Sequence, residues 1–408
     1  MACMQTCLAR DDCPLLQLDD EKTLMSDPRM MAGIPTMNAG LYRTIRFLVG
    51  DPVVYLEVPA SNNAWTSTLI CRDIEMGRAK VNARADAVAC PADYAPADGL
   101  SGDRETATAQ SAAEFLRRAG HRRVVVDRSL PMIYAEMLNR AGIEAVCDTE
   151  WGILERRRKD SQEIEFIRHA QRITEEVMEM ACATVARASA DAQGILHHDG
   201  SPLTSERMRT MIDIWLLERE CSNPGAIVAG GPVGADCHDH GHGILRTGEP
   251  VIVDIFPRDK KTLYNGDCTR TVVHGEIPAE VARMHAAVVA SKSAATQAVR
   301  AGVTGEKVHE ATVGAILAAG YRMGLSPADA PDHFTSMTHG TGHGLGLEVH
   351  EPPLLAAGGP ELVVGDVVTI EPGLYCKAIG GVRVEDMVVV RADGCENLNR
   401  LHEGLVWK

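Results

Sequence analysis

The chain has 408 residues, 45% of them apolar, and a formal net charge of −15. This length exceeds what one hydrophobic core usually holds, so we expect two domains. The negative charge argues against nucleic acid as a partner, because proteins that bind nucleic acids present a basic surface to the phosphates.

The sequence shows no sign of export or of a membrane span. No apolar run reaches membrane-spanning length, and acidic residues between positions 11 and 21 stand where a signal peptide needs a basic start and an apolar core. The twelve cysteines include no C-x-x-C pair, and a large protein of the cytosol usually keeps such thiols reduced. We therefore expect a soluble, cytoplasmic protein with no membrane partner. The group Cys3, Cys7 and Cys13 fits no zinc spacing, and we interpret it as structural or incidental.

The first part of the chain is predicted to be a small α/β domain. Residues 1–40 show no clear period, and we expect them to be irregular. Apolar and β-branched runs broken by Gly, Pro, Asn and Asp predict strands at residues 44–49, 53–58, 68–72, 87–90, 123–127 and 143–147. Helices are expected at residues 106–119 and 131–140. Alternating strands and helices indicate an α/β arrangement, and this part has no group of titratable residues suited to catalysis.

A basic run, R-R-R-K at residues 156–159, marks the junction between the domains. We accordingly place the first domain at residues 1–155 and the second at residues 156–408. A run of like charges is usually a solvated helix face or linker, and we prefer that interpretation to a binding patch.

The second domain opens with helices and a hairpin. Apolar residues recur at helical spacing at Ile164, Ile167, Ile173, Val177 and Met180, which predicts a long amphipathic helix. A second helix is expected at residues 204–219, capped by Thr204 or Ser205. The strand V-I-V-D-I-F returns as Y-N-G-D-C-T-R-T-V-V, so the hairpin carries one acid on each arm. Two more helices are expected at residues 278–299 and 306–323.

A glycine-rich stretch at residues 226–243 contains three alternating histidines. It has neither a G-x-G-x-x-G nor a Walker sequence, so a nucleotide site is disfavoured. In extended backbone His238, His240 and His242 would share one face. We expect His238 to line a functional site and interpret His240 and His242 as surface residues.

The last third carries the residues that we expect to perform chemistry. The stretch T-H-G-T-G-H-G-L-G-L-E-V-H-E at residues 338–351 places three histidines on backbone that glycine lets bend closely around a ligand. Glu371 and Glu385 interrupt apolar strands, where a carboxylate is costly unless it is paired or binds a metal. Together with Asp254, Asp267 and one of the histidines, they form the right complement for two divalent cations.

Such a pair of cations supports hydrolysis. Two divalent ions roughly 3.5–4 Å apart polarise a carbonyl oxygen and lower the pKa of a bridging water. A histidine ligand suits Mn, Co, Fe or Zn better than Mg or Ca. Free imidazoles nearby would donate hydrogen bonds to the oxyanion of a tetrahedral intermediate. The implied reaction is hydrolysis of an amide or a similar acyl bond.

The order of these motifs closely resembles the creatinase/aminopeptidase ("pita-bread") family of metallopeptidases. The likeness rests on D-C-T-R-T, G-T-G-H-G-L-G-L-E-V-H-E, I-E-P-G-L-Y and G-V-R-V-E-D, within residues 238–387. The two-domain length and the last motif are most similar to the Xaa-Pro aminopeptidase and Xaa-Pro dipeptidase (prolidase) branch. Asp254 and Asp267 are 13 residues apart, two more than is usual in the family. The turn can absorb an even insertion without moving either aspartate off the metal face.

The resemblance implies an α+β fold, in which an N-terminal α/β creatinase-like domain precedes a pita-bread domain with a curved, mostly antiparallel sheet. It also implies a dinuclear metal site. Asp254 would chelate one metal, and Asp267 and Glu385 would bridge both. His343 would bind the other metal, with Glu371 as its carboxylate partner and general base.

The same resemblance implies the residues that surround the substrate. His238, His339 and His350 would line the cleft and steady the carbonyl or the leaving nitrogen. Arg383 lies two residues before Glu385 and so on the same strand face, where it would support the substrate or a ligand.

The implied function is a dimetal exopeptidase that removes an N-terminal residue, or splits a dipeptide, before proline. Manganese is the expected metal, with Co, Zn or Fe as alternatives, and a homodimer is the expected assembly. Other interpretations on the same scaffold are a metal-free, creatinase-like amidinohydrolase and a non-catalytic binding protein, but the intact ligand set favours the peptidase. A methionine aminopeptidase would not need a first domain of this size.

Overall fold

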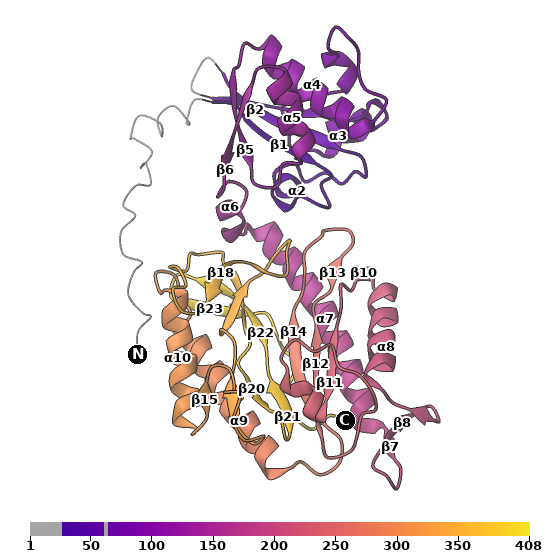
Figure 1. Cartoon of the computed structure of the whole chain (residues 1–408), viewed down its shortest axis with the longest axis vertical. Coiled ribbons are helices and arrows are strands. Elements are labelled where there is room, and N and C mark those ends of the chain that lie inside the picture. Colours follow the sequence, from indigo (N-terminus) through magenta and orange to yellow (C-terminus); the bar gives the residue numbers. More distant parts are fainter. Residues whose placement is uncertain (1–26, 61–63) are drawn as a thin grey trace. The chain divides into compact units, whose positions relative to one another are not determined.

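The computed structural model describes residues 27–60 and 64–408 of the chain (Figure 1). The chain divides into two compact units, the first ending at Gly152 and the second beginning at Ile153. The division that we placed after residue 155 would cut α6 (Leu154–Arg157). The group Cys3, Cys7 and Cys13 lies outside the described residues, and the nine cysteines within them are free thiols.

The first unit is a six-stranded mixed sheet with helices on both faces. Its strand order is β4-β3-β2-β1-β5-β6, with antiparallel pairs from β1 to β3 and parallel pairs elsewhere. The strands are β1 (Arg29–Gly33), β2 (Val53–Pro59), β3 (Trp65–Ile70), β4 (Ala87–Ala89), β5 (Arg123–Asp127) and β6 (Glu144–Asp148). Alternate strand residues pack against α4 (Arg104–Arg118) and α5 (Met132–Arg140) on one face, and against α2 (Ala39–Ile45) and α3 (Met76–Asn82) on the other.

Two expectations for this unit were wrong. Residues 29–33 are not irregular, because they form the inner strand β1. The predicted strand at residues 44–49 is instead the end of α2 and a loop. The Asn38 side chain caps this helix by accepting a hydrogen bond from the Leu41 amide, and Leu41 and Ile45, four residues apart, are both buried. The local cap and the packing outweigh the alternating pattern that suggested a strand.

The described part of the second unit has three larger, mostly antiparallel sheets and two small ones, which confirms the predicted α+β class. The strand orders of the larger sheets are β11-β12-β14, β15-β16-β20-β21 and β18-β17-β19-β22-β23. Among the described pairs of this unit, β15 and β16 run parallel and the others run antiparallel. The strands of these sheets are β11 (Ile227–Gly230), β12 (Pro250–Ile255), β14 (Cys268–Val273), β15 (Arg322–Met323), β16 (Thr335–Met337), β17 (Gly342–Gly344), β18 (Glu351–Leu355), β19 (Val367–Ile370), β20 (Gly373–Cys376), β21 (Gly380–Arg383), β22 (Asp386–Arg391) and β23 (Gly394–Asn397). Shorter strands are β7 (Ser189–Ala190), β8 (Leu196–His198), β9 (Ser201–Pro202), β10 (Cys221–Ser222) and β13 (Arg258–Asp259).

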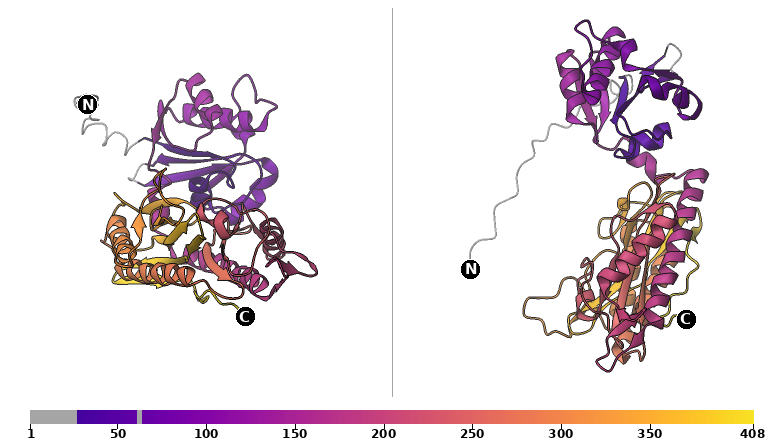
Figure 2. Two further views of the ribbon diagram at one scale, coloured as in Figure 1. Left: turned by 60° about the horizontal axis from the view of Figure 1, so that its bottom comes forward. Right: turned by 90° about the vertical axis from the view of Figure 1, so that its right-hand side faces the viewer.

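Four long helices lie on the outside of these strands (Figure 2). They are α7 (Ser161–Arg187), α8 (Ser205–Glu218), α9 (Ala279–Ala298) and α10 (Gly305–Ala318), and all four were predicted. The Asp160 and Glu163 side chains form a capping box that starts α7, and Thr204, one of the two expected caps, starts α8. No helix among the described residues combines the length and the apolarity needed to cross a membrane.

The basic run at residues 156–159 is not a solvated face, which corrects our interpretation of it. Arg156 and Lys159 are only 4% and 7% exposed. Both form ion pairs with Glu351, and Arg157 forms one with Asp366. Two of the four residues, Arg156 and Lys159, are therefore buried against acidic residues more than 190 positions later, contacts that local sequence does not reveal, while Arg158 is exposed.

Candidate metal centre

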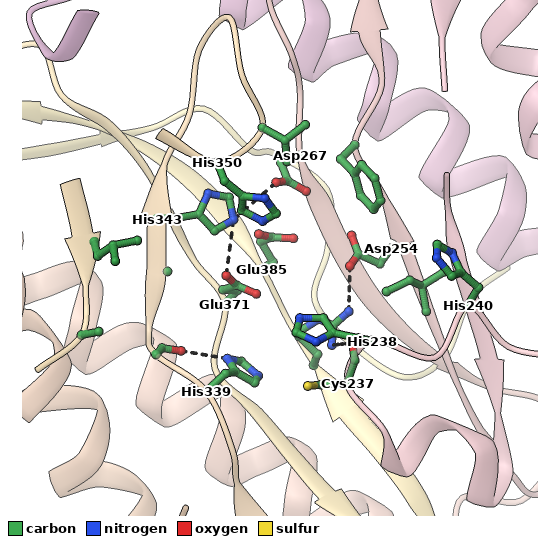
Figure 3. A pocket seen from close by; sticks show the side chains of 18 residues that line it. Cys237, His238, His240, Asp254, Asp267, His339, His343, His350, Glu371 and Glu385 are labelled. Carbon is green, nitrogen blue, oxygen red and sulfur yellow. Dashed lines mark hydrogen bonds and ion pairs between the residues drawn. The ribbon is translucent and has the colours of Figure 1, made fainter. Parts of the chain in front are cut away.

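A cavity of about 550 Å³ in the second unit brings the predicted site residues together. Its described lining includes all five candidate metal ligands, which are Asp254, Asp267, His343, Glu371 and Glu385. The other four predicted residues, His238, His339, His350 and Arg383, line it too. In Figure 3 the two glutamates and Asp267 lie around the His343 ring, and Asp254 faces them from β12.

The hairpin of β12 and β14 sets the two aspartates on one face. Asp254 pairs with Thr269 across the ladder, and Asp267 lies two residues before Thr269. Because side chains alternate along a strand, Asp254 and Asp267 therefore point to the same side. The longer connection forms β13 and a turn in which the Asp259 side chain accepts hydrogen bonds from the amides of Lys261 and Thr262.

Glycines allow the strand that carries His343 to pack closely. A Cβ atom on Gly342 would collide with the Thr369 carbonyl oxygen, so no other residue fits. His343 Nδ1 lies 3.1 Å from the Gly344 carbonyl oxygen, which can only accept a hydrogen bond. The ring therefore donates from Nδ1 and keeps the Nε2 lone pair, 3.5 Å from Glu371 Oε1 and 3.9 Å from Asp267 Oδ2. This tautomer is the one that a metal at Nε2 requires.

The carboxylates at the site lack enough positive charge to balance them. Burial and the charges of neighbouring carboxylates raise the pKa of Asp267 and Glu385 well above their ordinary values. Asp254 Oδ1 is buried without a hydrogen-bond partner among the described residues. Donor atoms of Asp267, His343 and Glu385 lie within 4.8 Å of one another. Buried acids in such a group are stable when cations are shared between them, so these residues fit a metal centre.

Arg383 and Thr269 support the candidate ligands from behind. Arg383 is 3% exposed and donates from Nη2 to Asp254 Oδ2 at 2.7 Å. The Thr269 hydroxyl donates to Glu385 Oε2 at 2.8 Å. The sequence indicated a supporting role for Arg383 but not for Thr269, which resembled an ordinary β-strand residue.

Tyr375 connects Arg383 to His339. Its hydroxyl accepts a hydrogen bond from Arg383 Nη1 at 2.9 Å and lies 2.7 Å from His339 Nε2. His339 Nδ1 lies 2.8 Å from the Gly340 carbonyl oxygen, so Nδ1 donates and Nε2 accepts from Tyr375. Burial lowers the pKa of His339 and favours this neutral ring. Both of its nitrogens are thus engaged, which sequence analysis did not anticipate.

The other two histidines are available to a substrate. No ring nitrogen of His238 or His350 makes a hydrogen bond to another described residue. The His350 ring meets the His343 ring edge to face, with centroids 4.4 Å apart. His240 is exposed, as we expected of a surface residue, and it also borders the cavity, which we did not expect. The structure therefore places two histidines where they can bind the reacting groups.

Apolar side chains form the remaining walls of the cavity. They are Ile227, Phe256, Val349, Leu354 and Ala356. Ile227 pairs with Asp254 across β11 and β12, and Phe256 follows Asp254 by two residues. A chemical centre of carboxylates and imidazoles is thus bordered by surface suited to an apolar side chain.

Comparison with known proteins agrees with this geometry. The model of metallopeptidase family M24 matches residues 165–392. The probable dipeptidase PepE of Mycobacterium tuberculosis is 39% identical over 183 residues, which cover 44% of this chain and 45% of that protein. The Xaa-Pro dipeptidase of Pyrococcus horikoshii is 29% identical over 163 residues, 40% of this chain and 42% of that protein. The matched region thus spans less than half the length of these curated relatives.

The fold likeness extends over nearly the whole chain. The crystal structure of X-Pro aminopeptidase from Thermotoga maritima matches with a TM-score of 0.74 and 22% identity, covering 95% of this chain and 99% of that one. The family match covers more than half of the chain and includes all five candidate metal ligands. The chain therefore belongs to metallopeptidase family M24, a metal-dependent family of pita-bread fold.

Proposed function

We propose that the protein is an exopeptidase that uses two divalent metal ions to hydrolyse the bond after an N-terminal residue, with Xaa-Pro peptides or dipeptides as substrates. One observation carries the proposal. Four carboxylates and the His343 imidazole, which keeps its Nε2 lone pair, line one cavity. Arg383 is the single permanent cation in the described lining of that cavity. Such an excess of buried negative charge calls for bound cations.

In this proposal the two ions would be held by Asp254, Asp267, His343, Glu371 and Glu385. Manganese suits this set of oxygen and imidazole donors, and Co, Zn and Fe are alternatives. Bound there, the ions would polarise the scissile carbonyl and make a water nucleophilic near neutral pH.

The residues of the chain would perform the proton transfer and the binding. Burial raises the pKa of Glu371, which suits a carboxylate that takes the proton of the attacking water as general base. His238 and His350, with free ring nitrogens, would hydrogen bond to the substrate carbonyl and the leaving nitrogen. His339 would contribute a fixed, neutral ring wall, held by Tyr375.

The preference for Xaa-Pro substrates rests on the names of similar proteins, an Xaa-Pro dipeptidase and an X-Pro aminopeptidase. The proposed homodimer rests on the family resemblance, and the proposed cytoplasmic location rests on the sequence patterns described above. Light scattering of the purified chain tests whether it forms a homodimer.

The activity is tested with full-length protein loaded with manganese and three probes, Leu-Pro, Leu-Pro-Gly and Leu-Gly-Gly. We expect release of leucine from the proline peptides, lost on chelation and restored by manganese. Glu371→Gln should lower kcat by roughly 10²–10⁴-fold, the usual contribution of a general base. No release from any probe would contradict the proposal. Leucine release that persists undiminished in the chelated enzyme would contradict the role of the metal ions.

A further inference from the structure

The Glu351 carboxylate is enclosed by the basic junction segment, defined as residues 156–159. Lys159 Nζ lies 2.6 Å from Glu351 Oε1, and Arg156 Nη1 lies 3.2 Å from Glu351 Oε2. The Lys159 and Glu351 side chains are each 1% exposed, and that of Arg156 is 4% exposed. Arg156 also contacts Glu348 at 2.6 Å. Two cations thus hold one acid out of reach of water.

This acid is the direct neighbour of a cavity histidine. Glu351 begins β18, and His350 precedes it. Glu351 is buried at the start of β18, whereas the exposed ring of His350, in the bend just before it, lines the cavity and contacts His343. The anchored carboxylate and the imidazole therefore share one peptide unit.

The Lys159 and Glu351 side chains pack closely against the backbone at Gly346. A Cβ atom on Gly346 would lie 2.7 Å from Glu351 Oε1 and 3.1 Å from Lys159 Cε. The Gly346 carbonyl oxygen accepts hydrogen bonds from the amide and the side chain of Asn265, two residues before Asp267. The Lys159 amide donates to the Gly365 carbonyl oxygen at 3.2 Å. The contact is therefore held in place on both sides, by the backbone at Gly346 and by the junction segment at Lys159.

We propose that Lys159 and Arg156 are positioning residues for His350, acting through Glu351. The ion pairs fix the position of Glu351 at the start of β18, and this position in turn fixes where the His350 imidazole lies in the cavity. The inference rests on the proposed function, because a role for His350 in turnover makes its position matter. It assigns a purpose to the basic run, which neither the metal ligands nor the substrate residues explain.

Arg157 supplies a matched control in the same segment. It donates to Asp366 Oδ2 at 2.7 Å and Oδ1 at 3.0 Å, and Asp366 is fully buried. Asp366 precedes β19, and no hydrogen bond or ion pair among the described residues joins it to His350 or Glu351. Arg157→Met therefore removes a buried ion pair from the same segment without removing any contact of Glu351 or His350.

The kinetic test compares Lys159→Met with Arg157→Met in full-length, manganese-loaded protein with Leu-Pro. We expect Lys159→Met to lower kcat roughly ten- to hundredfold, the cost of a small misplacement, with metal content unchanged. Arg157→Met should stay within about threefold of the wild type. In a His350→Ala background Lys159→Met should have no further effect, because residues that act as a unit are not additive. Should Lys159→Met fail to fold, Glu351→Gln replaces it, with the same direction expected.

A second readout does not depend on activity. In protein with isotope-labelled histidine, the His350 ring resonance should shift or broaden in Lys159→Met and stay unchanged in Arg157→Met. Equal kinetic losses in the two variants, additivity with His350→Ala, or an unchanged His350 resonance would each overturn the inference. If the wild-type protein cleaves no probe, the proposed function fails, and the resonance comparison alone decides the positioning role.

Discussion

At the scale of single residues, the order of the site depends on a chain of directed hydrogen bonds. Arg383 joins Asp254 to Tyr375, and Tyr375 in turn fixes His339. The two bonds of Arg383 are buried and that of His339 is partly buried, and in such places a hydrogen bond is stronger and an unpaired group more costly than in water. Removal of one member should therefore disturb the next one without dispersing the metal ligands.

Tyr375→Phe tests this chain. The phenyl ring keeps the packing, but Arg383 loses an acceptor and His339 loses a donor. We expect kcat to fall about tenfold, equivalent to one hydrogen bond of about 1.4 kcal/mol, with the metal content unaltered. Steady-state kinetics and metal analysis measure both quantities. Tyr321→Phe is the control, because its hydroxyl bonds to Glu280 outside the metal cavity. Equal effects of the two substitutions would refute a specific role for Tyr375.

The sequence revealed the chemistry of the site better than its support. Acids that interrupt apolar strands, such as Glu371 and Glu385, and histidines among glycines stand out because burial makes them costly. Tyr375 and Thr269 look like ordinary strand residues, and only the pairing of distant strands shows their partners. His240 is exposed as expected, but its place at the cavity was missed, since alternation along a loop does not say which face meets a cavity.

At the scale of elements, β17 fits against its neighbouring strands only because glycines stand on both sides of His343. Gly342→Ala would force a methyl group against the Thr369 carbonyl oxygen. We expect a loss of about 3 kcal/mol or more in the free energy of unfolding, as for severe overpacking. Denaturant unfolding measures this loss.

Gly314→Ala is the matched substitution. Gly314 lies inside α10, and a Cβ atom there meets nothing within 4 Å. Because alanine favours a helix over glycine, this variant should gain about 0.5–1 kcal/mol. A Gly342→Ala variant as stable as the wild type would show that the strand can move away from its neighbour.

Long periodic elements were predictable, and short context-dependent ones were not. The helices α7, α8 and α10 begin with side-chain caps, and the arms β12 and β14 are continuous buried runs. In contrast, β1 reads R-M-M-A-G and has no β-branched residue, and α2 depends on the Asn38 cap. The basic junction segment was misinterpreted because its acidic partners follow more than 190 positions later.

At the scale of the whole molecule, two compact units with separate cores predict two responses to metal removal. The two apolar clusters of the first unit lie entirely before Gly152, and Trp151 packs against one of them. All five candidate metal ligands belong to the second unit. Bound metal should therefore contribute to the stability of the second unit alone.

Chelation should accordingly destabilise one unit selectively. A ligand present at about 100 times its Kd stabilises the folded state by about 2.7 kcal/mol, which corresponds to about 5–10 °C in a unit of this size. In calorimetry we expect a chelator to lower the transition of the second unit by about that amount and to leave the other transition in place. Gly342→Ala identifies the transition of the second unit, because it lowers the same one. A chelator that shifts neither transition would contradict a structural contribution from bound metal.

The central claim is that five side chains from distant parts of the chain hold a pair of metal ions. The most direct measurement is anomalous diffraction at the manganese edge from crystals grown with manganese. The account predicts two peaks between Asp254, Asp267, His343, Glu371 and Glu385, within the cavity of the second unit. A map with no peak among these five side chains, in protein that binds manganese elsewhere, would contradict it.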